Sequence, residues 1–381
     1  MIVSKSFKIR IYPNKTQSIM IDKNIGCARF VYNKMLEEKK FAYETYKDDK
    51  RALWEYKYKT EKDLKTEFSW LSEAESSSLQ QARIDLSRAY TNFFASISHK
   101  SKGNSQFPKF HKKGIKDSFR IMVNNRNVKI DFDDRKIKLP KFGWINYRDN
   151  RVFDVSLVSS VTVSKSKTDK YFASFLCQFE IENIEKIQYS NDLIVKGLDM
   201  SMDKFYIDNE GKYPEYYRLY RNHEKQLAHL QRMVSKKQKG SANRKKAQLR
   251  LNKLHEKIAN SRKDFIEKLS TEIIRENDIV VIESLNMKGI AQSLHFGKSV
   301  NDLAWGMFVN RLEQKMQLTD KILIKADKWF ASSQICHICG YQNKKLTLKD
   351  REWDCPVCGS HLLRDENAGQ NLKQYGINFL S

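Results

Sequence analysis

Residues that interrupt regular structure are scarce in this chain, with 5 Pro and 14 Gly among 381 residues. This composition argues against an intrinsically disordered protein. No uninterrupted apolar run approaches the roughly 18 residues that a membrane-spanning helix requires. The first five residues, MIVSK, are not part of an apolar segment of the kind found in signal peptides. We therefore expect a cytoplasmic protein, associated with the nucleoid in a prokaryote and without a membrane partner.

Acidic residues are also few relative to basic ones. Asp and Glu number 46 and Lys and Arg number 70, which gives a formal net charge of +24. Such an excess in a soluble chain favours a polyanionic partner, and nucleic acid is the most common one. The 40% of hydrophobic residues suffice for real cores, and the length allows about two or three domains. The sequence indicates no particular oligomer.

Cysteine is scarce as well, yet four of the six cysteines form two pairs with C-x-x-C spacing. The pairs are Cys336/Cys339 and Cys355/Cys358. Their spacing is typical of a tetrathiolate zinc ribbon. The alternative, two disulfides or a redox motif, is disfavoured because disulfide frameworks belong to small secreted domains. Four thiolates leave no open coordination position, so we predict a structural Zn²⁺ ion.

The first 98 residues predict one strand and a helical block. Residues 6–12 alternate apolar and charged side chains, which is typical of a strand. Pro13 ends this strand, and Asn14 can cap a helix that begins near Lys15. Helical periodicity then continues, with breaks, to about residue 98.

The clearest helix is predicted to start at Ser77, which forms a capping-box pattern with Gln80. Gln80 and Gln81 lie on its polar face. A solvated surface and contact with nucleic acid both remain open for these two residues. The same holds for the basic, aromatic stretch 107–113, which suits base stacking as well as an ordinary loop.

Residues 118–182 predict β-structure. Alternating side chains and short turns favour an antiparallel barrel. The N-terminal strand would join it, which makes the helical block an insertion into a β-domain. The predicted strands are residues 119–123, 128–132, 136–139, 155–164 and 171–180.

From residue 193 the pattern changes to apolar strands that end on acids. Residues 193–199 end on Asp199, and a hairpin partner is predicted at 204–208 across the turn 209–211. Residues 279–283 end on Glu283. Further elements are a helix at 302–317, a strand at 322–326 and a last helix that begins at Asp365 and that Gly376 can cap.

Residues 215–276 predict two antiparallel basic helices with a turn at Gly240 and Ser241. A solvated helical hairpin is the simpler alternative, but the excess of positive charge favours contact with a phosphate backbone. The residues that we predict to bind nucleic acid here are Lys236, Lys237, Arg244 and Lys245.

Asp199, Glu283 and Asp365 are candidates for one metal site. Neighbouring strands can bring the first two acids together, and the last helix can present the third. Three converging carboxylates repel one another unless a cation holds them, and hard oxygen ligands favour Mg²⁺ or Mn²⁺. Two such ions about 4 Å apart can bind both the attacking and the leaving oxygen of a phosphodiester. The pattern alone leaves open that each acid merely caps a loop or faces solvent.

Several motifs resemble the TnpB family, the RNA-guided endonucleases of IS200/IS605-type transposons, which are regarded as ancestral to type V CRISPR effectors. The match covers nearly the whole chain. The motifs are YPNKTQ at 12–17, FVYN at 30–33, WL at 70–71, LQQA at 79–82, GLD at 197–199, IESLNMKG at 282–289, the four cysteines and RDENA at 364–368.

This resemblance implies an α+β multidomain protein: an RNase H-like (RuvC) nuclease core with a zinc-ribbon insert, and an antiparallel β-barrel interrupted by a helical lobe. The implied domains are residues 1–12, the first strand of the wedge barrel; 13–117, the helical recognition lobe; 118–190, the rest of the barrel; 191–330, the RuvC-like core; 331–360, the zinc-ribbon insert that binds target nucleic acid; and 361–381, the last core motif.

The resemblance also implies catalysis by Asp199, Glu283 and Asp365 as Mg²⁺ ligands. It implies a guide RNA from the transposon end, a double-stranded DNA target and a short transposon-adjacent motif that the protein reads near Gln80 and Gln81. A glutamine amide can pair with the major-groove edge of adenine.

Two positions depart from the family pattern. Leu363 stands where many relatives have an aspartate, and Gly369 stands where a second alanine is common. Because all three expected acids are present, we expect an active nuclease. The alternatives are an RNA-guided repressor of the same fold that does not cut, a DDE-type transposase, and a zinc-ribbon binding protein without chemistry.

Overall fold

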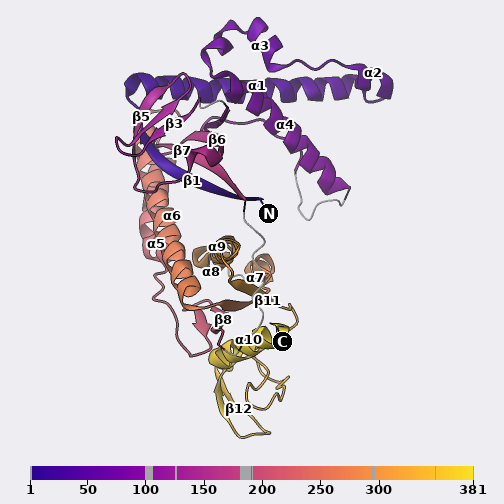
Figure 1. Ribbon diagram of the computed structural model, residues 1–381, viewed down its shortest axis with the longest axis vertical. Coiled ribbons are helices and arrows are strands. Elements are labelled where there is room, and N and C mark those ends of the chain that lie inside the picture. Colours follow the sequence, from indigo (N-terminus) through magenta and orange to yellow (C-terminus); the bar gives the residue numbers. More distant parts are fainter. Residues whose placement is uncertain are drawn as a thin grey trace. The chain divides into compact units, whose positions relative to one another are not determined.

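The computed structural model describes residues 2–98, 106–124, 127–180, 190, 192–293, 297–347 and 349–380, apart from the side chains of Lys288, Ser293 and Asn301. The chain forms two compact units, Met1–Ile181 and Glu182–Ser381, and Figure 1 follows both along the sequence. The sequence predicted a domain boundary between residues 190 and 191. Residues 181–189 and 191 lie outside the described residues. None of the described helices is long and apolar enough to cross a bilayer.

Helix α1 (Lys15–Tyr46) is capped by Asn14, as predicted. The backbone N–H of Gln17 donates to Asn14 Oδ1 over 2.8 Å, and the N–H of Asn14 donates to Gln17 Oε1 over 3.0 Å. This reciprocal pair satisfies two backbone donors at the helix start. The other helical elements of the first unit are α2 (Lys50–Glu55), α3 (Glu61–Glu67), the 3-10 helix η1 (Ser69–Glu73) and α4 (Ser76–Ile97).

The predicted capping box of Ser77 and Gln80 at the start of α4 is wrong. The Glu75 carboxylate instead accepts hydrogen bonds from the backbone N–H groups of Ser77 and Ser78, over 3.1 and 2.7 Å. An acidic side chain at this position also complements the helix dipole. The predicted polar face is divided as well, because Gln80 is exposed whereas Gln81 is only 7% exposed.

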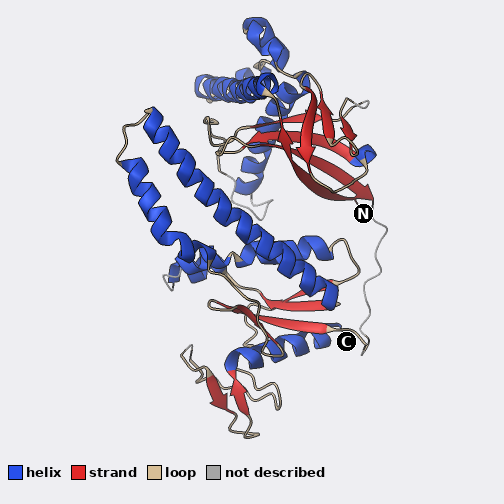
Figure 2. Cartoon of the chain, turned by 90° about the vertical axis from the view of Figure 1, so that its left-hand side faces the viewer, coloured by secondary structure: helices blue, strands red, loops and turns tan. Residues whose placement is uncertain are grey.

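The strands of the first unit form one curled antiparallel sheet (Figures 1 and 2). Strand β1 (Ile2–Tyr12) lies in its middle, between β7 (Tyr171–Glu180) and β5 (Gly143–Arg148). The sequence did not predict β5, whose exposed Trp144 obscures the alternation of buried Ile145 and Tyr147. The other strands are β2 (Ser118–Met122), β3 (Lys129–Asp131), β4 (Lys136–Leu139) and β6 (Val158–Lys165).

The strand order of this sheet is β2-β6-β7-β1-β5-β4-β3. The first strand therefore joins strands that follow the helical block, as predicted. Residues 155–157 form the 3-10 helix η2 (Val155–Leu157) rather than the start of a strand. Among the described residues β2 and β3 are the edges and are not paired with each other, so closure into a barrel stays a prediction.

The second unit is built on a four-stranded sheet of order β11-β10-β8-β9 (Figure 2). Strands β8 (Val195–Ser201), β10 (Ile279–Glu283) and β11 (Ile322–Ala326) are parallel, and β9 (Phe205–Asp208) is antiparallel to β8. The β8–β9 turn lies at residues 202–204, so the prediction that the turn at 209–211 joins these strands is wrong; that turn follows β9.

Both faces of this sheet are covered, which explains the apolar runs before the acids. Val280 and Ile282 of β10 pack against α6 (Ala242–Glu276) and α9 (Trp305–Met316). Ile279 and Val281 face the opposite way and pack with Leu372 of α10 (Arg364–Leu380). The sheet is thus the middle of three layers, with α10 alone on one side in Figure 2.

Further helices of the second unit are α5 (Leu219–Ser235), which forms an antiparallel hairpin with α6, α7 (Met287–Ser293) and α8 (Gly297–Leu303). The helix predicted at 302–317 is two helices, because Ala304 adopts a left-handed φ of +54° between α8 and α9. The short strands β12 (Glu352–Asp354) and β13 (His361–Leu363) precede α10.

Helix α10 lies in close backbone contact with the sheet. A Cβ atom at Gly197 of β8 would lie 2.1 Å from the carbonyl oxygen of Gly369, and one at Gly376 would lie 2.4 Å from Val281. The prediction that Gly376 caps the helix is therefore wrong, since this glycine is needed for packing. A Cβ at Gly369 would lie 2.8 Å from the backbone of Asp208, so an alanine at this position would require a shift of backbone atoms.

Candidate functional site

The three acids predicted from the sequence come from three elements of the second unit. Asp199 lies in β8, Glu283 is the last residue of β10, and Asp365 lies in the first turn of α10. All three line one cavity of about 700 Å³. Parallel neighbouring strands bring the first two together, and the packing of α10 on β8 adds the third.

Burial raises the pKa of Asp199 well above its usual range, and the negative charges of Glu283 and Asp365 raise it further. Burial also raises the pKa of Glu283, against the opposing effect of a hydrogen bond from Ser332. The Ser332 hydroxyl donates this bond to Glu283 Oε1 over 2.5 Å. The cavity therefore concentrates negative charge that water screens poorly, which is the environment in which carboxylates bind a cation.

Asp365 is held by two arginines in this structure. Arg364 donates from Nε and Nη2 to Asp365 Oδ1, over 3.1 and 2.9 Å, and Arg351 Nη1 lies 3.6 Å from Oδ2. Both arginines also line the cavity, together with Arg218 and Arg221. Guanidinium groups match the geometry of phosphate oxygens, so the cavity combines groups for a cation with groups for a phosphate.

Leu363, which departs from the expected family pattern, lies in β13 and is 53% exposed. It is not among the residues that line the cavity.

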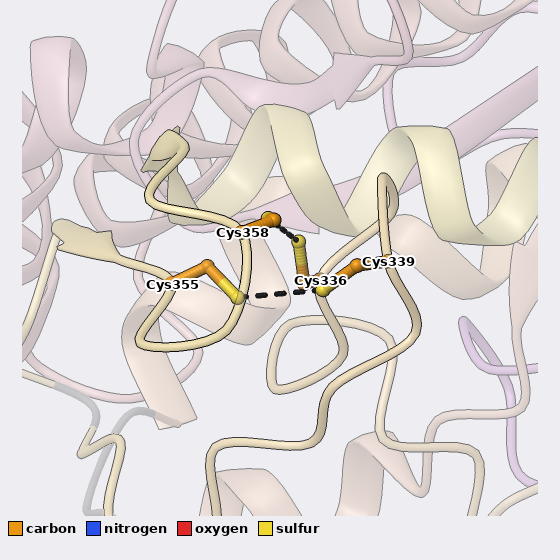
Figure 3. A group of neighbouring side chains, drawn as sticks. All are labelled: Cys336, Cys339, Cys355 and Cys358. Atoms are coloured by element: carbon orange, nitrogen blue, oxygen red, sulfur yellow. Dashed lines mark hydrogen bonds between the residues drawn. The ribbon is translucent and has the colours of Figure 1, made fainter.

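The four predicted cysteines converge in a second site of the same unit (Figure 3). Their sulfur atoms all lie within 4.8 Å of one another, with 3.7 Å between Cys336 and Cys358 and 3.5 Å between Cys339 and Cys355. A tetrahedral ion with Zn–S bonds of about 2.3 Å holds sulfurs about 3.8 Å apart. The cluster is therefore compatible with structural zinc.

Local geometry supports this cysteine cluster. Gly340 and Gly359, directly after each pair, have φ of +77° and +73°, the left-handed conformation that glycine adopts readily. The backbone N–H of each donates to the carbonyl of the first cysteine of its pair, over 2.8 Å. Among the described residues, this is the one group of three or more metal-ligating side chains that is gathered so closely, and the three acids are more widely spaced.

The basic residues predicted on the α5–α6 hairpin have different environments. Lys236 and Lys245 are exposed and Lys237 is half-buried. Arg244 instead donates from Nη1 to the carbonyl oxygens of Val234 and Lys237, over 2.9 and 2.8 Å. Its guanidinium thus closes the C-terminal end of α5, a structural function that the sequence did not reveal.

Gln81 lines a cavity of about 350 Å³ in the first unit, together with Asp85, Arg88 and His111. Gln80 lies beside it on the exposed face of α4. The structure therefore separates these neighbours, and contact with nucleic acid stays a prediction for both.

Sequence reasoning missed Ser332, Arg351 and Arg364 at the acid cavity. The Arg364-Asp365 pair was visible within the RDENA motif, but nothing local to Ser332 indicates that its hydroxyl reaches Glu283, 49 positions away.

Three family profiles match the chain. A profile described as "Probable transposase" (OrfB_IS605) matches residues 178–294, one described as "Helix-turn-helix domain" matches residues 1–48, and one described as "Cas12f1-like, TNB domain" matches residues 305–372. In this structure residues 2–46 form a strand and one long helix rather than a helix-turn-helix.

Two curated relatives are similar over nearly the whole chain. A protein of Streptomyces pristinaespiralis named "Putative RNA-guided DNA endonuclease" is 33% identical, over 98% of this chain and 90% of its own length. InsQ of Escherichia coli (strain K12), which has the same designation, is 30% identical over 98% of this chain and 92% of its own length.

A solved structure, "Cryo-EM structure of the Cas12f1-sgRNA-target DNA complex", is similar in fold, with a TM-score of 0.56 at 13% identity. The match covers 98% of this chain and 99% of that one. Together with the matching profiles and the full-length relatives, it shows that this chain belongs to the TnpB family.

Proposed function

We propose that this protein is an RNA-guided DNA endonuclease that hydrolyses phosphodiester bonds at the cavity of the second unit. The observation that carries the proposal is the convergence of Asp199, Glu283 and Asp365 from two parallel strands and one helix on a single cavity. The names of two relatives that match over nearly their whole length support the same activity.

An RNase H-type (RuvC) core accounts for this convergence. Such a core places its acids at the ends of neighbouring parallel strands and on a helix that packs over the sheet. The order β11-β10-β8-β9, with β9 alone antiparallel, and the packing of α10 on β8 support this assignment.

The donor set of the cavity fits Mg²⁺ or Mn²⁺. Asp199, Glu283 and Asp365 would hold the ions, because carboxylate oxygens are the ligands these hard cations prefer. The raised pKa of Asp199 supports this fit, since burial and the nearby charges of Glu283 and Asp365 both raise it. When bound, the ions supply activation of water and stabilisation of the departing 3′-oxygen.

The arginines of the cavity would bind and orient the DNA backbone. Arg218 and Arg221 line the same cavity as the acids and suit a phosphate on the strand to be cut. Arg351 and Arg364 neutralise Asp365 in this structure. If Asp365 held a cation together with Asp199 and Glu283, it would exchange its contacts with these two arginines, which would then be available for phosphate oxygens.

The remaining parts of the proposal concern guide and target. Zn²⁺ at the four cysteines would be structural. The exposed basic residues of the α5–α6 hairpin, Lys236 and Lys245, would contact the guide RNA from the transposon end or its duplex with target DNA. Base pairing would read the target sequence, while the protein would read a short transposon-adjacent motif, with Gln80 near it.

The test is a cleavage assay with the protein co-expressed with its flanking transposon-end RNA. The complex is incubated with Mg²⁺ and a plasmid library that carries the target beside a randomised flank. We expect cutting that requires guide, flank motif and Mg²⁺ and that Asp199→Ala abolishes, whereas Lys245→Ala retains it at low salt.

Two other outcomes would contradict the proposal. Binding of guide and target without cutting, equal in wild type and Asp199→Ala, would indicate an RNA-guided repressor. Joining of DNA ends without a guide would indicate a transposase, as the profile description "Probable transposase" suggests.

A further inference from the structure

The segment between β11 and the first cysteine pair connects the two sites of the second unit through side chains. Ser332 in this segment is only 2% exposed. Its hydroxyl donates to Glu283 Oε1 over 2.5 Å, and its backbone N–H donates to the carbonyl of Phe330 over 2.9 Å. A serine hydroxyl has one proton to donate, so this bond fixes which oxygen of Glu283 is engaged and leaves Oε2 for another partner.

The backbone of Ser332 is held in turn by the helix that carries Asp365. Asn371 of α10, 6% exposed, donates from Nδ2 to the carbonyl oxygens of Ser332 and Ile335 over 2.7 and 2.6 Å. These two bonds use both protons of the amide. The position of the Ser332 hydroxyl is therefore set from α10 and not only from its own loop.

One turn earlier on α10, Asn367 connects the same segment to the cysteine cluster. Asn367 is 1% exposed, and its Nδ2 donates to Ile335 O over 2.7 Å. Its Oδ1 accepts from the backbone N–H of His337 over 3.0 Å. His337 lies between Cys336 and Cys339, so this bond joins α10 to the first cysteine turn.

These contacts form one continuous path from Glu283 through Ser332, Asn371 and Asn367 to the cysteine turn. We infer that Ser332 is a positioning residue for Glu283. Through Asn371 and Asn367, the cysteine ribbon acts as a brace, a support that keeps the Glu283 carboxylate at a fixed position relative to Asp365. The inference rests on the function proposed above, because it assumes that the Glu283 carboxylate, which Ser332 orients, binds a cation.

The chemistry follows a general pattern of metal sites. Residues that hydrogen-bond a ligating carboxylate fix its orientation, and their loss typically costs about 10–100-fold in metal affinity or activity. Removal of the Ser332 hydroxyl leaves Glu283 free to rotate without removing any ligand. Removal of the Asn371 amide releases the segment on which Ser332 lies.

The experiment measures Mn²⁺ binding to the full-length, zinc-loaded protein by electron paramagnetic resonance, with zinc content and melting temperature determined for each variant. Ser332→Ala and Asn371→Ala should weaken the Asp199-dependent Mn²⁺ site about 10-fold or more, with one zinc per chain retained. Ser332→Thr, which keeps the hydroxyl, should bind more tightly than Ser332→Ala.

Matched controls come from the same unit. Ser270, 0% exposed in α6, and Asn277, 3% exposed after it, are a buried serine and asparagine whose side chains donate to backbone carbonyls outside this path. Ser270→Ala and Asn277→Ala should leave Mn²⁺ affinity unchanged, which separates positioning from a general loss of stability.

Two results would overturn the inference. If Asp199→Ala abolishes Mn²⁺ binding but Ser332→Ala binds within about twofold of wild type, against the ~10-fold expected, the positioning function is refuted and the proposed nuclease site stands. If wild type binds no Mn²⁺ that depends on Asp199, both the proposed cation site and the brace are refuted.

Discussion

Substitution of Gly197 by alanine tests the close contact between β8 and α10. The new Cβ would lie 2.1 Å from the carbonyl oxygen of Gly369 and 2.7 Å from the backbone nitrogen of Lys373. Both neighbours are backbone atoms of a helix, so neither can rotate away. Overpacking of this kind typically costs about 1–3 kcal/mol, and backbone contacts this short place the cost at the upper end.

The expected loss of about 3 kcal/mol corresponds to a decrease of roughly 6–12 °C in the melting temperature of a unit of this size. The assay is thermal denaturation of zinc-loaded protein, in which the two units can give separate transitions. Because α10 carries Asp365, DNA cleavage by the complex of the variant with guide RNA should also be slower than wild type, even when it is assayed at a temperature below the melting temperature.

The matched control is Gly306→Ala in α9, where a Cβ meets nothing within 4 Å. This substitution should raise stability by up to about 1 kcal/mol, because alanine is the better helix former. The reasoning fails if Gly197→Ala melts at or above the wild-type temperature, or if the two substitutions change stability in the same direction.

Three further predictions concern pH, metal and nucleic acid. Burial of His111 in its stack with Tyr32 lowers its pKa to about 4. Because the histidine of the unfolded chain is protonated at higher pH, the stability of the first unit should fall as pH decreases from about 6.5 to 4. Denaturation of His111→Phe over the same pH range should show a smaller loss of stability. Removal of zinc should expose the ribbon to proteolysis while the first unit stays resistant, because the core around the cysteines is small; equal digestion with and without chelator would contradict a metal-stabilised ribbon. Lys245→Ala should reduce the slope of log RNA affinity against log salt concentration by about 1 without changing stability. Arg244→Ala should instead destabilise the helical hairpin by about 1–3 kcal/mol. A salt titration of RNA binding and a melting curve for both variants test this difference.

Local sequence predicted the parts of the fold that depend on neighbours along the chain. Asn14 caps α1 with Gln17 because a helix start needs only side chains within one turn. The two C-x-x-C pairs predicted the cysteine cluster because each turn is set by its own residues and a glycine. The apolar run that ends on Glu283 predicted a buried strand, and the resemblance to a known family supplied the partners of that acid.

Contacts between distant segments were decided only by the tertiary structure. Ser332 reaches Glu283, and Arg244 reaches the end of α5, through packing that no local pattern encodes. The same holds for Gly376, which the sequence assigned to a helix cap and which the structure uses for contact with Val281. Spacing along the chain thus predicted the cysteine cluster, whereas the layers around the second sheet determined which residues contact the three acids.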